Sequence, residues 1–586
     1  MRHLQLCLIC LSLVLIWGHP KVIAVESITD DEVKVGFCPK LEPKTEPRSI
    51  SLITFLEEDR RITIKVVGSR VFDSNDIINY IIEKSPNSEI QSIFQSVQEG
   101  QEPKLENINL IDFYKILTKL ITQLYLERGY FTSTVIGLEE SETPEISADN
   151  ILKIEVIEKG LREIEIRGLD RLNLSYLCDR ILLGAGFPFN QPSLEEQLRL
   201  LRVDPLFETI EADLVVSREA SDELKVIVRV KEANSFTASF GLDNYSPPSI
   251  GSERTGAGLY YRNLTGLGDD VFVSYSRSSS SGANGWDVYY RVPLNARNAT
   301  LQFRIAPYEQ EITQSPFDDL DISGNSQVYE INFRQPLIRS IREELGVSVG
   351  FAFQEGRTFV EGEGVPFDVG SDDDGSSRTR TLKLSLDYIK RDSDGAWAFR
   401  SQLNWGVDIF DATRNAAPIP DGRFWSWLGQ AQRVQQLNDD NLLLVRADIQ
   451  LTPDSLLSAQ QFTIGGVASL RGYRQNARSG DNGFRFSMEN RITISRDEGG
   501  NPRIQIAPFF DMGAVWNDLE NPNTNKFLDQ TFLVSIGAGL LWQDFLGIDN
   551  LGIRLDYGYP LINLDDRGDN IQDDGFYFGI NYQLYL

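Results

Sequence analysis

The sequence is poorest in histidine, methionine and cysteine, with 2, 3 and 4 of these residues among 586. Both histidines, His3 and His19, lie in an apolar stretch at the N-terminus, and removal of that stretch leaves a chain without histidine. A Ser-His-Asp triad, a histidine-ligated metal and a histidine acid–base are then excluded. We therefore expect a protein that is not an enzyme, with no catalytic residue, no metal site and no cofactor.

Positive charge is also scarce. The chain has 57 Lys and Arg residues against 85 Asp and Glu residues, which gives a formal net charge of −28. Such a surface repels a phosphate backbone, so we expect no nucleic-acid partner. The Gly-x4-Gly-Lys-(Ser/Thr) pattern of a phosphate-binding loop does not occur either, so the sequence offers no ATP site of that kind.

Long hydrophobic runs are missing beyond the N-terminal stretch. The one clear run, residues 4–17, follows Arg2 and falls short of the roughly 20 apolar residues that a membrane-spanning helix needs. Small side chains at Val22 and Ala24 suit cleavage after Ala24. These features predict a secretory signal peptide at residues 1–24, in preference to an N-terminal membrane anchor.

Residues 25–48 are polar and contain three prolines, which favour an extended tether. We interpret this segment as a periplasmic linker. Removal of the leader leaves two cysteines, Cys38 in the linker and Cys178 in an expected helix. An exporting compartment can oxidise such thiols, but we favour the interpretation that both are unpaired.

Two segments after the linker follow the same plan. Residues 62–68 and 164–168 each alternate apolar and polar side chains, as a half-buried strand does, and each ends at a glycine. A helical pattern comes next in each segment, at residues 110–124 and 192–203, and two further strands complete it. The pattern predicts two α+β modules, at residues 49–160 and 161–234.

Residues 235–586 have a different pattern. Along residues 399–409, every second side chain is apolar over most of the stretch, and intervening residues such as Arg400 and Gln402 are polar. About sixteen such stretches of about 10 residues recur, and a strand of that length crosses a bilayer when tilted. The sequence therefore predicts a 16-stranded antiparallel transmembrane β-barrel that follows two periplasmic α+β domains.

The connections between these stretches alternate in length, short at 263–268, 337–343, 391–395 and 496–501, and long at 308–326, 356–375 and 452–481. Short turns on one rim and long loops on the other are typical of an outer-membrane barrel, whereas a soluble sandwich or propeller does not need this parity. We expect the modules and the short turns to share the periplasmic side. Acidic stretches at 372–374 and 565–574 are interpreted as solvated loop surface.

The longest connection, residues 452–481, carries the densest motif. Its paired glycines, Gly465 and Gly466, predict a tight fold, and the cation that follows them is Arg471. Alternation along the strand that contains Asp511 places this carboxylate on the lumenal face, where it can meet Arg471. In a water-filled lumen such a pair contributes only about 1 kcal/mol, so we expect it to select one conformation of the loop.

Three motifs match a known family. Leu470, Arg471, Gly472 and Tyr473 match its (V/I/L)RGY loop, Phe509, Asp511 and Gly513 match its F-x-D-x-G strand, and Tyr125, Gly129 and Tyr130 match the Y-x-x-x-G-Y end of a helix in its first POTRA domain. On these motifs the sequence resembles the TpsB transporters of two-partner secretion. These are relatives of the haemolysin and filamentous-haemagglutinin exporters, in the superfamily of POTRA-bearing barrels.

The resemblance implies two POTRA domains and a barrel in the outer membrane of a Gram-negative-type bacterium, in contact with lipids and lipopolysaccharide. It implies that the sixth long loop folds into the lumen, with Arg471 on Asp511. The implied partner is a secreted TpsA-like exoprotein, which the POTRA domains capture unfolded by strand addition. One feature departs from the family, because residues 25–48 are too short and too weakly periodic for the helix that plugs the barrel in many members.

Other functions remain as alternatives. An assembly factor that inserts other barrels belongs to the same superfamily, but such factors tend to carry more POTRA domains. A passive porin does not need the two modules. An enzyme without histidine would rely on a carboxylate pair, and the acidic residues here cluster in loops, where ion pairing and solvation explain them better.

Overall fold

The computed structural model describes residues 34–39, 45–57, 60–105, 108–136, 147, 149–216, 224–315, 317–517, 521–522 and 530–586. The predicted signal peptide lies outside these residues. The chain divides into two compact units, one over Asp30–Ala233 and the other containing Asn234–Leu586. None of the helices in the described residues is both long and apolar enough to cross a membrane.

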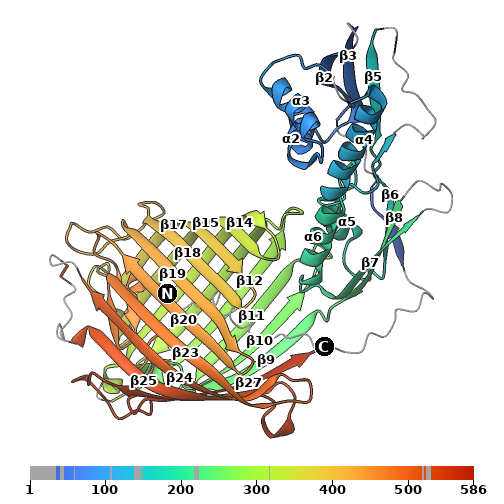
Figure 1. Cartoon of the computed structure of the whole chain (residues 1–586). Coiled ribbons are helices and arrows are strands. Elements are labelled where there is room, and N and C mark those ends of the chain that lie inside the picture. The colour runs from blue at the N-terminus through green and yellow to red at the C-terminus, as the bar shows by residue number, and fades with distance from the viewer. Residues whose placement is uncertain are drawn as a thin grey trace. The chain divides into compact units, whose positions relative to one another are not determined.

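The first module, within the described residues, is a four-stranded sheet with three helices (Figure 1). Its elements are β2 (Arg48–Glu57), β3 (Arg60–Ser69), α2 (Ser74–Lys84), α3 (Ser88–Gln98), α4 (Leu110–Glu127), β4 (Thr134–Ile136) and β5 (Ile151–Ile157). The sheet order is β2-β3-β5-β4, and β3 and β5 run parallel. The strand predicted at 62–68 and the helix predicted at 110–124 are confirmed as β3 and α4, whereas β2 was not predicted.

Helix α4 forms because its apolar residues repeat at helical spacing behind a polar cap. The Asn109 side chain accepts a hydrogen bond of 2.7 Å from the Asp112 amide, a cap that contributes about 1 kcal/mol. Phe113, Leu117 and Ile121 lie one turn apart and are fully buried. This face joins the sheet in a single apolar core.

Within the described residues, the second module repeats the plan with fewer helices. Its elements are β1 (Val35–Phe37), β6 (Leu161–Arg167), α5 (Leu174–Leu182), α6 (Gln191–Arg202), β7 (Phe207–Val216) and β8 (Leu224–Glu232). The sheet order is β1-β6-β8-β7, and β6 and β8 run parallel. The strand predicted at 164–168 and the helix predicted at 192–203 are confirmed as β6 and α6.

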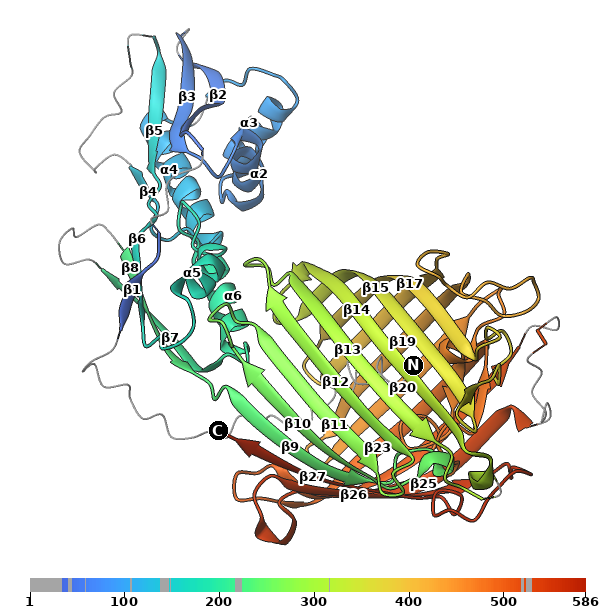
Figure 2. The same cartoon turned by 180° about the vertical axis from the view of Figure 1, so that it is seen from behind.

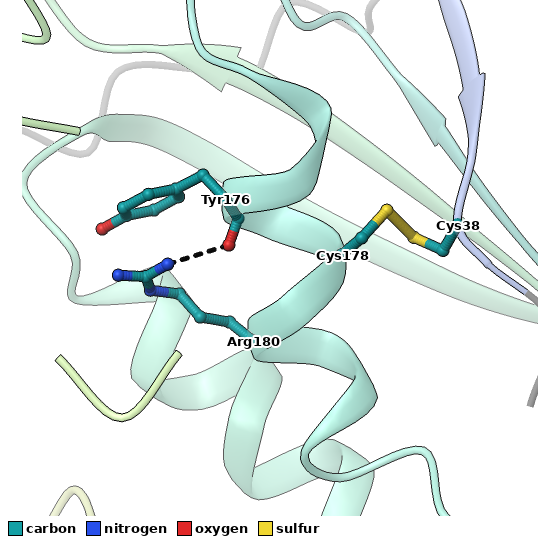
Figure 3. The surroundings of a disulfide bond; sticks show 4 residues. All are labelled: Cys38, Tyr176, Cys178 and Arg180. Carbon is teal, nitrogen blue, oxygen red and sulfur yellow. Dashed lines mark hydrogen bonds between the residues drawn. A yellow bond between two sulfur atoms is a disulfide. The ribbon is translucent and has the colours of Figure 1, made fainter. Parts of the chain in front are cut away.

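Strand β1 corrects two expectations. It lies inside the segment 25–48 that we interpreted as a linker, yet it pairs antiparallel with β6, and the Cys38 amide donates to the Ile164 carbonyl at 3.0 Å. Cys38 is disulfide-bonded to Cys178 of α5, so the two cysteines are not unpaired (Figure 3). A three-residue strand is too short to show alternation, and a pairing across 140 residues has no local signal.

Sixteen strands of the described chain close into one antiparallel barrel, as predicted. They are β9 (Phe236–Asp243), β10 (Arg254–Arg262), β11 (Asp270–Ser278), β12 (Ala283–Pro293), β13 (Thr300–Glu311), β14 (Ile322–Arg339), β15 (Glu343–Val360), β17 (Ser376–Arg391), β18 (Gly395–Gly406), β19 (Trp425–Asn438), β20 (Asn441–Leu451), β23 (Asn482–Arg496), β24 (Pro502–Trp516), β25 (Phe532–Trp542), β26 (Leu551–Pro560) and β27 (Phe576–Tyr585). The two-residue β16 (Glu363–Gly364) extends only the end of β15. The barrel closes where β27 pairs with β9 (Figure 2).

Alternation decides which side chains face out of the barrel. On β18, Phe399, Leu403 and Trp405 are exposed on the outer face, whereas Gln402 between them is buried. The predicted parity of the connections also holds. Seven short turns lie on one rim, and seven of the eight connections on the other rim are longer, the exception being 279–282.

Candidate functional site inside the barrel

The connection 452–481 joins β20 to β23, and we call it the motif loop. It carries a two-stranded sheet of β21 (Phe462–Ile464) and β22 (Arg478–Gly480). Apolar side chains of the loop pack against the barrel strands β24 and β25, in a cluster of Phe462, Ile464, Leu470, Tyr473, Val515 and Leu533. The motif loop is therefore a folded element docked on the inner wall.

The paired glycines make the tight turn that the sequence suggested. Gly465 and Gly466 have φ angles of 110° and 93°, a region that favours glycine. The Gly466 amide lies 3.0 Å from both the Leu470 and the Tyr473 carbonyl oxygens, so the turn closes onto the arginine motif. A Cβ atom on Gly466 would lie 2.9 Å from the Gln475 Cα atom, so a larger residue here would be strained by both the contact and the positive φ.

The structure brings Arg471 and Asp511 together. The Arg471 Nε and Nη2 atoms donate to the two carboxylate oxygens of Asp511 at 2.8 and 2.9 Å, and the Arg471 amide donates to the same carboxylate at 3.1 Å. The guanidinium carbon lies 3.4 Å from the centre of the Phe509 ring. A bidentate pair of this kind fixes orientation as well as distance.

Further charged side chains of the wall complete an arginine–acid cluster, which consists of Arg471, Arg491, Arg554, Glu489, Asp511 and Asp556. Arg471 Nη1 lies 2.5 Å from Glu489 Oε2 and 3.7 Å from Asp556 Oδ1. Arg554 donates to Glu489 at 2.7 Å and to Asp556 at 2.6 Å, and Arg491 donates to Glu489 at 2.8 Å. Three cations and three anions therefore cancel in formal charge.

Burial changes the energetics of the Arg471–Asp511 pair. The two residues are 4% and 0% exposed, so water does not screen them as it would in an open lumen. The value of about 1 kcal/mol expected for a screened pair is therefore too low. Removal of one partner from a buried pair costs about 3–5 kcal/mol, because the other charge stays buried without compensation.

Gly472 and Tyr473 bind the wall through hydrogen bonds. The Gly472 amide donates to the Tyr577 hydroxyl at 3.0 Å, and this hydroxyl donates to the Tyr473 carbonyl at 2.5 Å. The Tyr473 hydroxyl donates to the Val534 carbonyl at 2.7 Å. Every residue of the Leu470–Tyr473 motif thus contacts the wall or the apolar cluster beside it.

The wall approaches the motif so closely that it needs glycine. A Cβ atom on Gly558 of β26 would lie 2.5 Å from the Gly472 amide nitrogen and 2.8 Å from the Arg471 carbonyl carbon. A Cβ atom on Gly513 of the F-x-D-x-G strand would lie 3.1 Å from Leu470 Cδ1, so this position is also tight. These glycines provide the space in which the motif loop docks.

The third motif occupies a different place, at the joint between the two modules. The Tyr125 hydroxyl donates to Glu158 at 2.8 Å, and burial raises the pKa of Tyr125. Gly129 lies against Pro192 of α6, and its carbonyl accepts from the Gln191 amide at 3.1 Å. Tyr130 packs edge-on against Phe72, with ring centres 5.8 Å apart. This motif orders the joint between the modules.

The acidic stretch 565–574 is not simply solvated loop surface, which corrects our interpretation. Asp573 is 5% exposed and pairs with Arg474 of the motif loop, and Asp566 pairs with Arg478 at 2.8 Å. The stretch 372–374 is also paired in part, because Asp372 accepts from Arg378 at 2.6 Å. Acidic side chains in loops that look solvated in the sequence can thus pair with arginines that are distant in the sequence.

A model of the haemolysin secretion/activation proteins ShlB/FhaC/HecB matches residues 222–541, more than half of the chain. The chain belongs to this family. The match confirms the resemblance to TpsB transporters, and the α+β modules are accordingly called POTRA domains below.

Relatives in this family are described as transporters. The chain is 24% identical to the outer membrane transporter CdiB of Escherichia coli over 75% of each chain, and 22% identical to the hemolysin transporter protein ShlB of Serratia marcescens over 78% of each. The solved structure of CdiB from Escherichia coli shares the fold with a TM-score of 0.66, at 18% identity over 93% of this chain and 92% of that one. BamA from Haemophilus ducreyi lacking POTRA domains 1–3 aligns with a TM-score of 0.51, at 15% identity over 92% of this chain and all of that one.

Sequence reasoning missed several residues that hold the motif loop. Glu489, Asp556 and Arg554 belong to the cluster, and Tyr577 and Gly558 support the Gly472 backbone. Alternation could have placed Glu489 on the inner face, because it lies two residues after Ser487, the cross-strand neighbour of Asp511. The other four lie on β26 and β27, and no local signal connects those strands with the loop.

Proposed function

We propose that the chain is an outer-membrane pore that secretes one protein partner, the arrangement called two-partner secretion. The observation that carries the proposal is the motif loop, which Arg471 docks on the inner wall of a closed barrel. Family membership and the relatives' description as outer membrane transporters support it. In this proposal the barrel spans the outer membrane of a Gram-negative-type bacterium, among lipids and lipopolysaccharide, with the POTRA domains and short turns in the periplasm.

The POTRA domains capture the unfolded exoprotein in this scheme. Extended chains bind sheet edges through main-chain hydrogen bonds, which need little sequence information. In the described residues the edge strands are β2 and β4 of the first sheet and β1 and β7 of the second. Because β2 and β7 have 10 residues each and β4 and β1 have 3, the longer edges are the better docking sites.

The lumen provides the path. It holds a cavity of about 1960 Å³ beside the motif loop, with polar lining residues that include Arg446, Asp448 and Glu489. An unfolded chain passes such a wall without losing its hydration, and displacement of the motif loop widens the path. No nucleotide takes part in the scheme, since folding of the exoprotein outside the cell supplies the direction.

Deletion of the gene that encodes this chain, followed by proteomics of the culture medium and of the outer membrane, tests the proposal. Loss of one large secreted protein, with normal amounts of other outer-membrane barrels, is the expected result. A general loss of outer-membrane barrels would instead favour an assembly factor, the alternative that the fold similarity to BamA raises. Complementation with the intact chain is the control for both outcomes.

A further inference from the structure

The connection 561–575 between β26 and β27, which we call the last loop, reaches the motif loop from the long-loop rim. Asp573 accepts hydrogen bonds from Arg474 Nε at 2.8 Å and Nη2 at 2.7 Å. The Asp573 side chain is 3% exposed and the Arg474 side chain 23% exposed. This bidentate pair is therefore a mostly buried contact, in contrast to the exposed Arg567–Asp574 pair of the same loop.

The neighbouring Gln572 is fully buried and uses both ends of its amide. Its Oε1 accepts from the Gln475 amide of the motif loop at 2.9 Å. Its Nε2 donates to the carbonyl oxygens of Asn244 and Ser246 at 2.5 and 2.7 Å. A carboxylate in this position could accept the first hydrogen bond, but it could not donate the other two.

Asn244 and Ser246 belong to the connection 244–253 between β9 and β10, so the contact extends to the seam that closes the barrel. Asn244 Oδ1 accepts from the Phe578 amide of β27 at 2.8 Å. In the same region, Asn570 of the last loop donates to Ser252 at 3.0 Å. Gln572 thus joins three chain segments: the motif loop, the last loop and the first strand pair of the barrel.

We propose that Gln572 and Asp573 are positioning residues that latch the motif loop in its docked place and couple that place to the β27–β9 seam. The inference rests on the proposed function, in which the motif loop is displaced for export. The arginine–acid cluster holds the Leu470–Tyr473 part of the loop, and the latch holds the following residues, 474 and 475, from the last loop. Release of the motif loop then requires both sets of contacts to break, together with the Arg478–Asp566 pair between the same two loops.

Conductance of the purified full-length chain in planar lipid bilayers tests the latch. Asp573→Asn removes the charge without changing shape, and Gln572→Glu removes two donors. Each should raise the open probability of the channel at least about tenfold, because Asp573→Asn weakens a buried, charge-assisted contact and Gln572→Glu leaves two carbonyl oxygens without their donor. Asp574→Asn is the matched control, because Asp574 in the same loop makes only a highly exposed pair with Arg567 and should leave the open probability unchanged.

A second measurement separates positioning from general stability. Arg474→Gln breaks the same pair from the motif loop, so Arg474→Gln with Asp573→Asn should open no more often than either single variant. Heat-modifiable migration should show an intact barrel in all of them. Wild-type open probability, additive effects in the double variant, or loss of the barrel form would each overturn the latch.

The assay needs no exoprotein, so the two proposals can fail separately. If the deletion strain loses no secreted protein but the latch variants open more often, the proposed function fails and the latch stands. If secretion depends on the chain but the latch variants conduct like the wild type, the latch alone fails.

Discussion

At the scale of single residues, the Arg471–Asp511 pair is asymmetric. Arg471 also lies close to Glu489 and Asp556, whereas among the described residues Arg471 is the cation that pairs with Asp511. Loss of Asp511 leaves Arg471 with two acids, but loss of Arg471 leaves Asp511 buried with the Ser487 hydroxyl and a backbone amide. The two partners are therefore not equivalent.

This asymmetry predicts the order of two variants. Arg471→Ala should reduce secretion of the exoprotein about tenfold or more, because export in this account needs a motif loop that returns to its docked place, and an uncompensated buried carboxylate destabilises that place. Asp511→Ala should have a smaller effect, and the double variant should be little worse than Arg471→Ala. Quantitative blotting of the medium measures the effect, with heat-modifiable migration to show that the barrel is intact. Normal secretion by Arg471→Ala would contradict the assigned role of the pair.

The glycine on the wall supports a second prediction. Gly558→Ala should undock the motif loop, because the new methyl group overlaps the Gly472 backbone. Gly241→Ala on β9 is the control, since a Cβ atom there would lie 3.9 Å from its nearest neighbour across the strands, Ile580 O. Limited proteolysis of the two variants should show cleavage within 465–476 only for Gly558→Ala. Equal resistance of both variants would show that the close approach is not required.

The sequence predicts part of this site for a clear physical reason. Arg471 and Asp511 could be brought together because one lies in a motif and the other lies on a strand whose face follows from alternation. Asp556 and Tyr577 could not, because their contacts depend on how far β26 and β27 are shifted around the barrel. A single sequence does not show that shift.

At the scale of elements, β1 shows how a disulfide can fix a short strand that makes few hydrogen bonds. Cys38 ties the strand to α5, and the short ladder to β6 adds hydrogen bonds at the sheet edge. In the chain-entropy account, a cross-link across 140 residues restricts the unfolded chain by about 5 kcal/mol. The strand thereby covers one edge of the second POTRA sheet.

Removal of the cross-link should free that edge. In the full-length variant with Cys38→Ser and Cys178→Ser, the amides of β6 that face β1 should exchange hydrogen faster than in the wild type. Amides of β8 in the sheet interior should change little, and they serve as the internal control. Hydrogen exchange followed by mass spectrometry measures both. Unchanged exchange in β6 would mean that the ladder alone holds β1.

Strand β2 shows why one element of the first POTRA domain was missed. Its pairing with β3 shifts register between Ser51 and Ile53, and the adjacent side chains of Leu52 and Ile53 are both buried. A bulge of this kind breaks the alternation by which strands are recognised in a sequence. The neighbouring β3 alternates without interruption and was predicted.

At the scale of the whole molecule, the barrel is the part that the sequence predicts best. Each of its strands separates an apolar outer face from a polar lumen, so alternation follows from the environment of every strand. Cys38 illustrates the opposite case, since no pattern near it indicates a partner in α5. The docked motif loop combines both cases. Its motif can be recognised in the local sequence, whereas the wall residues that bind it lie far away in the sequence.

Transport by the purified full-length chain tests the central claim most directly. The chain is inserted into liposomes with its POTRA domains outside. The exoprotein is the one that the deletion strain fails to secrete, and its unfolded N-terminal part is added without nucleotide. Exoprotein protected from added protease should accumulate inside these vesicles, and much less should accumulate with Arg471→Ala. Absence of protected exoprotein in vesicles whose barrels are folded and conduct ions, or protection only after ATP is added, would contradict a nucleotide-independent secretion pore.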